Sequence, residues 1–220
     1  MTNRLVIFGA GGLAREFHDI VEAVNAQDAQ HGDAPTWEFL GFIDGSTQRD
    51  ARVATRGPIL GDDAFVEHLA EGTHFVVAIA QTSVRRRVAE LAESHGLVGA
   101  VIVHPRALIG DHAVTLGAGT IVAANAIITT DVTLGRHVHV DRGVQIGHDS
   151  VLADFVSTYP AATIAGTVSI EAGATVGSNA TVIQGLTIGE NAFVGAGAVV
   201  VRDVPSDVTV VGVPAKPVTS

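Results

Sequence analysis

From Val114 to Asp203 the chain reads, in groups of six, VTLGAG TIVAAN AIITTD VTLGRH VHVDRG VQIGHD SVLADF VSTYPA ATIAGT VSIEAG ATVGSN ATVIQG LTIGEN AFVGAG AVVVRD. The third place of every group is aliphatic, with the single exception of Thr158. An amphipathic helix would place its apolar residues three and four positions apart instead. The repeat therefore predicts neither a helix nor an ordinary hairpin.

A period of six, with a large aliphatic residue in one place and frequent glycine, is the sequence signature of a parallel β-helix. Each group forms one short strand and a corner, and three groups close one coil of about 18 residues. Gly and Asn suit such corners because corners often require positive φ. The pattern continues one residue out of register before Val114, so we expect the β-helix to begin near Ala107 and to run for about five coils. A β-sandwich is disfavoured, since its strands would be spaced irregularly at roughly 8–12 residues.

The first part of the chain has a different organisation. Short apolar stretches, RLVIFG, EFLGFIDG, THFVVAIA and LVGAVIV, alternate with helical patterns in LAREFHDIVEAVN and SVRRRVAELAESHG and with a turn followed by a helix in ILGDDAFVEHLAEG. Alternating strands and helices predict a small α/β domain with a parallel sheet of Rossmann type. We place the boundary near Pro105, which gives an N-terminal domain of residues 1–106 and a β-helix of residues 107–220.

Composition excludes several classes of function. The net charge is -10 and Lys216 is the only lysine, whereas a nucleic-acid surface needs clustered Lys and Arg. The chain has no cysteine, so disulfides, thiolate metal sites and cysteine nucleophiles are excluded. No export signal is visible, and no apolar stretch approaches the ~20 residues of a membrane helix. We therefore expect a cytoplasmic protein that does not bind a membrane.

Glycines follow the first predicted strand at Gly9, Gly11 and Gly12, where backbone N–H groups at the start of a helix can approach a phosphate. The dinucleotide fingerprint G-x-G-x-x-G is absent from this turn. Asp44 follows the second strand, where a carboxylate can accept a hydrogen bond from a ribose hydroxyl or a base N–H. A tight turn and a solvated loop would explain these residues separately. Together they favour a mononucleotide or nucleotide-sugar site.

Among the histidines, His148 stands out because Asp149 follows it, halfway along the coils. A histidine with a carboxylate neighbour is suited to act as a general base, although a surface histidine on a corner is the plain alternative. Some trimeric β-helices bind zinc through three histidines. His137 and His139 are candidates for such a site with His148, but their spacing does not match that arrangement, so we expect no metal.

Several motifs in order carry a resemblance that covers nearly the whole chain: GAGGLAREFHDIVEAVN, WEFLGFIDG, PILGDD, AVIVHPRALIG, the hexads, IGHDS and VVVRDVPSDVTVVGVPAKP. This ordered set resembles the sialic acid O-acetyltransferase and bacillosamine-type sugar N-acetyltransferase family. The resemblance implies a Rossmann-like domain that holds a nucleotide-sugar and a left-handed β-helix that forms a homotrimer. It also implies that acetyl-CoA lies in the groove between neighbouring subunits.

The resemblance places the catalytic His-Asp motif on His148 and Asp149. The second histidine of many relatives, in H-I-A-P-G-A, is Ser157 here, and Ala161 replaces the glycine. The residues expected to bind the nucleotide-sugar are Gly9, Ala10, Gly11, Gly12, Leu13, Asp44 and Gly45, with Leu13 and Gly45 departing from the usual pattern. The residues expected to bind acetyl-CoA are Ser157, Gly166, Ser178 and Ala196, the last three because positions one coil apart stack along a corner.

The expected activity is therefore transfer of an acetyl group from acetyl-CoA to the amino group of a nucleotide-linked sugar. Two alternatives stay open from the sequence. One is O-acetylation of a sugar by an enzyme of the same family, and the other is a non-catalytic β-helix scaffold subunit.

Overall fold

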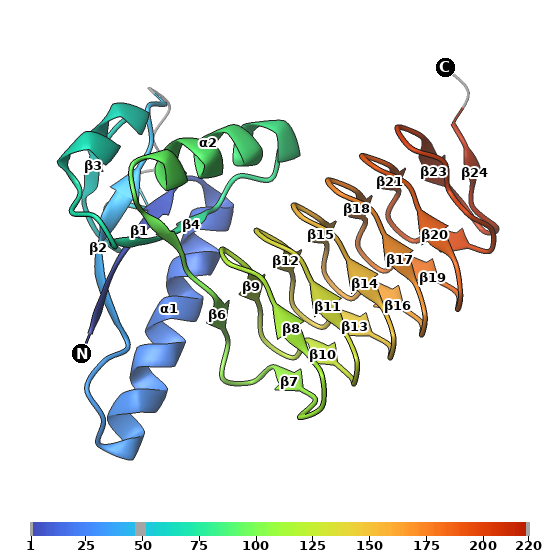
Figure 1. The fold of residues 1–220 in the computed structure, drawn as a ribbon, viewed down its shortest axis with the longest axis horizontal. Helices are drawn as coiled ribbons and strands as arrows, with labels where there is room; N and C mark the ends of the chain where they lie inside the picture. Colours follow the sequence, from blue (N-terminus) through green and yellow to red (C-terminus); the bar gives the residue numbers. More distant parts are fainter. Residues whose placement is uncertain (1, 47–51, 219–220) are drawn as a thin grey trace. The chain divides into compact units, whose positions relative to one another are not determined.

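The computed structural model describes residues 2–46 and 52–218, and the chain divides after Pro105 into two compact units (Figure 1). The first unit contains a five-stranded parallel sheet with the strand order β3-β2-β1-β4-β5. This order confirms the Rossmann-type sheet that the alternating pattern predicts. The strands are β1 (Asn3–Phe8), β2 (Trp37–Ile43), β3 (Ile59–Gly61), β4 (His74–Val77) and β5 (Val98–Gly99), followed by β6 (Ile102–Val103).

The helices of this unit are α1 (Gly12–His31), the 3-10 helix η1 (Asp63–His68) and α2 (Thr82–Ser94). The turn and helix expected between residues 59 and 72 are only partly correct. Ile59 pairs with Phe42 and begins β3, so the sheet takes the start of that segment. Asp62 then accepts a hydrogen bond from the Ala64 N–H and caps the short η1, because Asp favours a cap over a helix interior.

The second unit is a parallel β-helix with three flat faces, as the six-residue period predicts. Partner strands pair in parallel one coil apart, for example Thr133 with Val151. The first face contains β7 (Leu108–Ile109), β10 (Ile127–Ile128), β13 (Gln145–Ile146), β16 (Thr163–Ile164), β19 (Thr181–Val182) and β22 (Val199–Val200). The second contains β8 (Thr115–Leu116), β11 (Thr133–Leu134), β14 (Val151–Leu152), β17 (Ser169–Ile170) and β20 (Thr187–Ile188). The third contains β9 (Ile121–Val122), β12 (His139–Val140), β15 (Ser157–Thr158), β18 (Thr175–Val176), β21 (Phe193–Val194), β23 (Thr209–Val211) and β24 (Lys216–Pro217).

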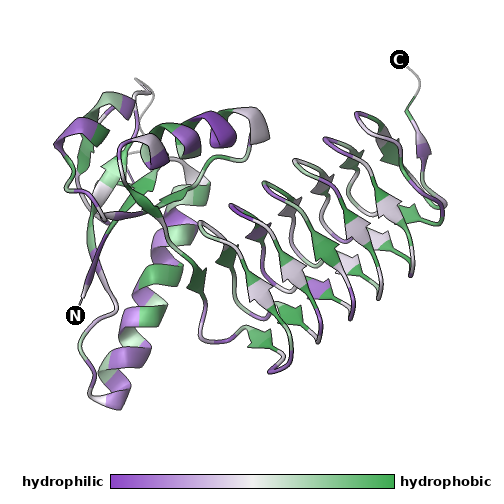
Figure 2. Ribbon diagram, in the orientation of Figure 1, coloured by the Kyte–Doolittle hydropathy of each residue, from purple (hydrophilic) through white to green (hydrophobic). Residues whose placement is uncertain are grey.

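The third-place aliphatic residues fill the interior of the coils, and hydrophobic strands recur from coil to coil in Figure 2. Ile128, Leu134 and Ile146 are each 1% exposed. Thr158, the exception to the pattern, is also buried, and its hydroxyl donates to the His139 carbonyl at 3.1 Å. That hydrogen bond lets a polar residue occupy an apolar interior.

The sixth place of each group forms the corner, and from Gly119 to Gly197 its residues adopt the left-handed conformation. Gly119 has φ 76°, Asn125 has φ 60° and Asp149 has φ 58°. Glycine adopts this conformation freely, and Asn and Asp tolerate it better than most residues. The glycines and asparagines at the corners are therefore explained by the positive φ that the corner backbone requires.

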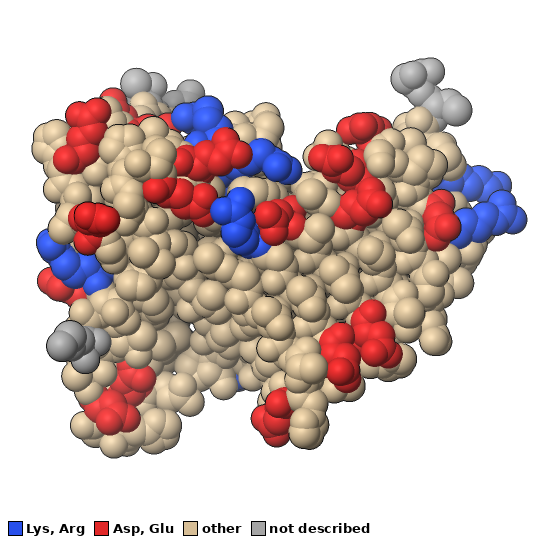
Figure 3. Space-filling model, in the orientation of Figure 1, with Lys and Arg blue, Asp and Glu red and all other residues tan. Residues whose placement is uncertain are grey.

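Parallel stacking continues beyond Asp203, where the regular hexads end. Val204 bridges to Ile188, and β23 pairs in parallel with β21. Val204 and Val210 are both buried, so they take interior places although the spacing between them is irregular. Acidic side chains are spread over the face drawn in Figure 3, with wide uncharged areas between them. None of the helices in the described residues is long and apolar enough to cross a membrane.

Candidate active site

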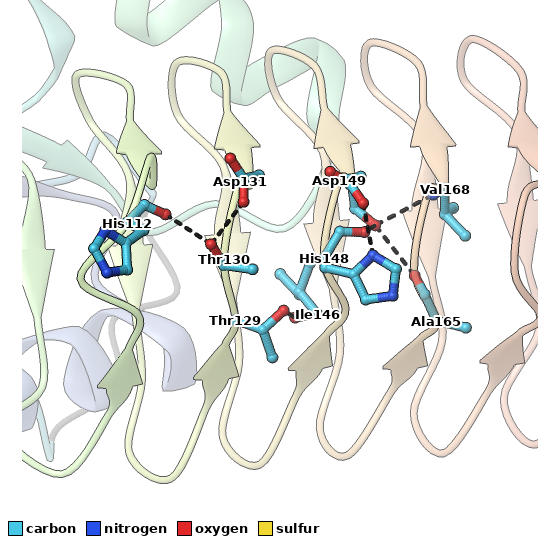
Figure 4. A network of polar contacts seen from close by, with 10 residues as sticks. His112, Thr129, Thr130, Asp131, Ile146, His148, Asp149, Ala165 and Val168 are labelled. Carbon is cyan, nitrogen blue, oxygen red and sulfur yellow. Dashed lines mark hydrogen bonds and ion pairs between the residues drawn. The ribbon is translucent and has the colours of Figure 1, made fainter.

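His148 lies on a corner of the β-helix between β13 and β14, and its ring contacts Asp149 (Figure 4). The distance from His148 Nδ1 to Asp149 Oδ2 is 2.7 Å. The same arrangement occurs one coil earlier, where the Thr130 hydroxyl donates to Asp131 Oδ2 at 2.7 Å. Both aspartates have a positive φ, so the corner backbone turns each carboxylate toward the preceding side chain. The contact between His148 and Asp149 therefore results from the backbone conformation at the corner of the coil.

Gly166 lies one coil further along and leaves room for the His148 ring. A Cβ atom on Gly166 would lie 2.6 Å from both Cε1 and Nε2 of His148. The Thr167 N–H donates to the His148 carbonyl at 2.7 Å and aligns the two corners. Within the described residues, the Gly166 N–H makes no hydrogen bond. This glycine thus offers an unused donor beside the imidazole.

Together these groups are suited to acyl transfer. The Asp149 carboxylate engages Nδ1, which leaves Nε2 of His148 for an incoming acceptor. The side chains of His148 and Asp149 are 54% and 58% exposed, so a substrate can reach them. Acyl transfer needs a base for the attacking group and a donor for the oxyanion. His148 is the candidate for the base, and the Gly166 N–H is the candidate for the oxyanion donor.

The other residues expected to bind acetyl-CoA lie elsewhere on the coils. Ser178 and Ala196 share a corner between the third and first faces, where the Gly197 N–H donates to the Ser178 carbonyl at 2.8 Å. Ser157 is 4% exposed and lies in β15, paired with His139 of β12. The structure therefore brings His148, Asp149 and Gly166 together, and Ser157, Ser178 and Ala196 are not part of that cluster.

The first unit contains a cavity of about 460 Å³ where its parallel strands end. Gly9 follows β1, Asp44 and Gly45 follow β2, and Ile79 lies beyond the end of β4. Ligands of open α/β sheets bind outside the carboxyl ends of the strands. The cavity therefore stands at the expected place for a nucleotide.

Asp44 connects the two loops at this edge of the sheet. Its Oδ2 accepts from the Ala10 N–H and its Oδ1 from the Ser46 N–H, both at 2.6 Å. Gly9 has φ 98°, and a Cβ there would lie 2.9 Å from the Ala78 carbonyl oxygen, so the turn requires glycine. The carboxylate thus holds the glycine turn in place.

The remaining residues of the predicted nucleotide site have different positions. Gly11 is the N-cap of α1 without a side-chain capping bond, so the first N–H groups of the helix are available to an anion. Ala10 is buried, Gly12 is exposed and Leu13 is half-buried. None of these four described residues lines the cavity.

Sequence reasoning missed three charged residues of the cavity, Asp62, Asp63 and Arg87. Asp63 and Arg87 form an exposed ion pair at 3.0 Å. The two aspartates follow β3, so recognition of that strand would have placed them at the carboxyl edge of the sheet. Arg87 lies within α2 and has no comparable sequence signal.

The three histidines considered for zinc have unlike surroundings. His137 and His139 are buried, and the His137 ring stacks on Phe155 at 5.2 Å between centroids. His148 is about half exposed. Within residues 2–46 and 52–218, no group of three His, Cys, Asp or Glu side chains is arranged to hold a metal ion.

Comparison with known protein families and relatives agrees with this architecture. Residues 4–92 match the PglD N-terminal domain, and residues 167–202 match the bacterial transferase hexapeptide repeats. The chain is 33% identical to a GDP-perosamine N-acetyltransferase of Escherichia coli over 162 residues, which cover 74% of this chain and 70% of the relative.

Solved structures give the same result over the full length. A perosamine N-acetyltransferase variant from Caulobacter crescentus, in complex with CoA and GDP-perosamine, is 30% identical with a TM-score of 0.87, covering 100% of this chain and 99% of that one. The acetyltransferase domain of PglB from Neisseria gonorrhoeae is 28% identical with a TM-score of 0.86, covering 99% and 100%. A second structure of that domain contains acetyl coenzyme A.

The fold and the His-Asp corner define a hexapeptide-repeat acyltransferase. The chain belongs to the PglD-type nucleotide-sugar N-acetyltransferase family. Its activity is the acetyl-CoA-dependent N-acetylation of a nucleotide-linked sugar. The expectations of this activity and of acetyl-CoA as the acetyl donor are therefore confirmed.

Proposed function

We propose that His148 is the general base of this reaction, that Asp149 orients its ring, and that the Gly166 N–H stabilises the oxyanion. The single observation that carries the proposal is the contact of His148 Nδ1 with Asp149, which leaves Nε2 to take the proton of the acceptor. The clearance above Gly166 supports it, because a side chain there would occupy the position of the ring.

In this mechanism the amino nitrogen of the sugar attacks the thioester carbonyl carbon of acetyl-CoA. His148 removes one proton from that nitrogen as the N–C bond forms. The carbonyl oxygen carries the negative charge of the tetrahedral intermediate and accepts a hydrogen bond from the Gly166 N–H. The C–S bond then breaks, and the proton held by the imidazole passes to the CoA sulfur, so that the products are the amide and free CoA.

The nucleotide part of the acceptor binds in the cavity of the first unit. We assign phosphate binding to the backbone of Gly9–Gly12 at the start of α1, and binding of the nucleoside to Asp44 and Gly45. The Escherichia coli and Caulobacter relatives are named for GDP-perosamine or bind it. GDP-perosamine is therefore the first acceptor to test.

The enzyme acts as a homotrimer. Two outward-facing apolar residues lie in consecutive coils of the first face, Leu108 at 64% and Ile127 at 38% exposed, and such residues favour packing against another copy. The candidate acetyl-CoA residues Ser178 and Ala196 lie at a different corner from His148. A groove between two copies, each presenting one corner, accommodates both sets. Light scattering should give about three times the 22.6 kDa chain mass, and a monomer at micromolar concentration would contradict this assembly.

A screen of amino sugars linked to GDP, UDP and dTDP tests the function. Release of CoA from acetyl-CoA is followed with a thiol reagent, and the matching free sugars serve as controls. The proposal expects turnover of GDP-perosamine that greatly exceeds turnover of the free amino sugar. Turnover of a hydroxyl acceptor alone would favour sugar O-acetylation, and acetyl-CoA binding without turnover of any acceptor would favour a scaffold.

A further inference from the structure

Ser150 places a buried hydroxyl immediately after the His148–Asp149 pair. Its side chain is 0% exposed. The first place of each hexad is otherwise aliphatic, except at Thr120. A hydroxyl in such an apolar column is costly unless it forms hydrogen bonds, so its partners show what it does there.

The Ser150 hydroxyl is inserted into the turn from Ala165 to Val168. The Val168 N–H donates to Ser150 Oγ at 3.2 Å, and Ser150 Oγ donates to the Ala165 carbonyl at 3.1 Å. At several other corners the equivalent N–H bonds directly to the carbonyl three residues earlier, as Ala162 does with Tyr159 at 3.1 Å. Here Ser150 Oγ instead bridges the Val168 N–H and the Ala165 carbonyl, the two ends of the turn.

This turn carries Gly166 and is held in an unfavourable backbone conformation. Thr167 has φ 60°, which is uncommon for a β-branched residue and implies strain. Its N–H donates to the His148 carbonyl at 2.7 Å. The bond from the Thr167 N–H to the His148 carbonyl and the two bonds of Ser150 therefore link this turn to the preceding coil.

We propose that Ser150 is a positioning residue for the acetyl transfer. By bridging the two ends of the turn, its hydroxyl orients the Gly166 N–H toward the thioester oxygen and keeps Gly166 beside the His148 ring. The inference rests on the proposed function, because it assumes that Gly166 supplies the oxyanion donor.

Thr120 provides a matched control within the same β-helix. Its hydroxyl donates to the Gly135 carbonyl at 3.0 Å and accepts from the Val138 N–H at 3.3 Å. These partners have the same sequence offsets as those of Ser150, but no residue of the Gly135–Val138 turn has a role in the proposed mechanism. Ser150 Oγ also lies 3.5 Å from the His148 carbonyl oxygen, a long contact with no counterpart at Thr120. Loss of either hydroxyl therefore removes the same two bonds to the next coil, and only one loss affects the active site.

The test compares Ser150→Ala with Thr120→Val, each of which removes a hydroxyl and leaves a residue type common in this column. We expect kcat of Ser150→Ala to fall about 10-fold or more, with KM for acetyl-CoA unchanged. Thr120→Val should keep kcat within about twofold while both variants lose similar thermal stability. Ser150→Thr should restore kcat, since a threonine makes the same contacts at position 120.

A second readout examines the oxyanion donor directly. A hydrogen bond from Gly166 lowers the infrared stretching frequency of the thioester carbonyl in bound acetyl-CoA. This shift should shrink in Ser150→Ala and persist in Thr120→Val. Equal changes of kcat in the two variants, or an unchanged carbonyl frequency in Ser150→Ala, would overturn the inference. Full activity of His148→Ala would instead refute the assignment of the base, and the carbonyl measurement does not depend on that assignment.

Discussion

The His148 ring lies so close to Gly166 that a single added methyl group would displace it: the Cβ of an alanine would stand 2.6 Å from Nε2. The two residues are one coil apart, and the Thr167 N–H joins their corners by its bond to the His148 carbonyl. The position of the proposed base thus depends on the absence of a side chain in the next coil.

Gly166→Ala should lower kcat by about 10- to 100-fold, because the ring must move away from its reactive position. The measurement is steady-state kinetics of Gly166→Ala, His148→Ala and the double variant. In the His148→Ala background the added methyl group should cost nothing further, since no ring remains to displace. Additive losses would mean that Gly166 acts independently of His148.

His148→Ala should lower kcat by about 10²–10⁴-fold, the usual cost of removing a positioned general base. The assembly and the affinity for acetyl-CoA should persist, because the side chain is on the surface of the β-helix. Titration calorimetry with acetyl-CoA and light scattering provide these controls. Near-normal turnover on a confirmed acceptor would show that another group is the base or that the amine arrives already deprotonated.

Asp149→Asn should be milder than His148→Ala, with a loss in kcat of about 10-fold. The carboxylate holds the imidazole through its contact with Nδ1, and an amide at the same place orients the ring less firmly. Asparagine tolerates the left-handed corner that residue 149 occupies, so the backbone is preserved. A kcat/KM equal to that of the wild type would argue against a role for this carboxylate.

Asp44→Ala should raise KM for the nucleotide-sugar by about 10- to 100-fold and leave KM for acetyl-CoA unchanged. The substitution removes a carboxylate that accepts hydrogen bonds from two backbone N–H groups, and the bond from Ala10 anchors the glycine turn. Asp28→Ala is the control, because Asp28 also accepts a backbone N–H, from Thr36 at 2.7 Å, but does not line the cavity. If Asp44→Ala raised KM equally for the nucleotide-sugar and for acetyl-CoA, the cavity would not be the binding site of the nucleotide-sugar.

Thermal stability should fall as the pH is lowered from about 7.5 to about 5.5, and His18→Gln should make that dependence shallower. Burial lowers the pKa of His18, against the opposing charges of Glu22 and Asp19. The unfolded chain therefore binds a proton more readily than the native state, and native stability is lost as the pH decreases. Burial also lowers the pKa of His74, so some dependence should remain. Melting curves of wild type and variant with the same slope against pH would exclude a contribution from His18.

Much of the architecture follows from the sequence because the repeat is local and regular. An aliphatic residue at each third place can be buried only if every group forms the same strand, and each corner needs a residue that accepts positive φ. The adjacency of His148 and Asp149 is likewise a local feature, since one corner conformation is enough to bring the two side chains together. The repeat, its corners and the His148–Asp149 pair could therefore be predicted from the sequence alone.

What only the tertiary structure decided depends on contacts between distant parts of the chain. Ile59 begins a strand because it pairs with β2. Unless that strand is known, the sequence does not indicate that Asp62 and Asp63 line the cavity. The bonds of Ser150 to the turn around Gly166 likewise form only when one coil stacks on the next. A repeat determines which residues point inward, but the hydrogen bonds between coils depend on the actual distances between their corners, and those distances exist only in the folded chain.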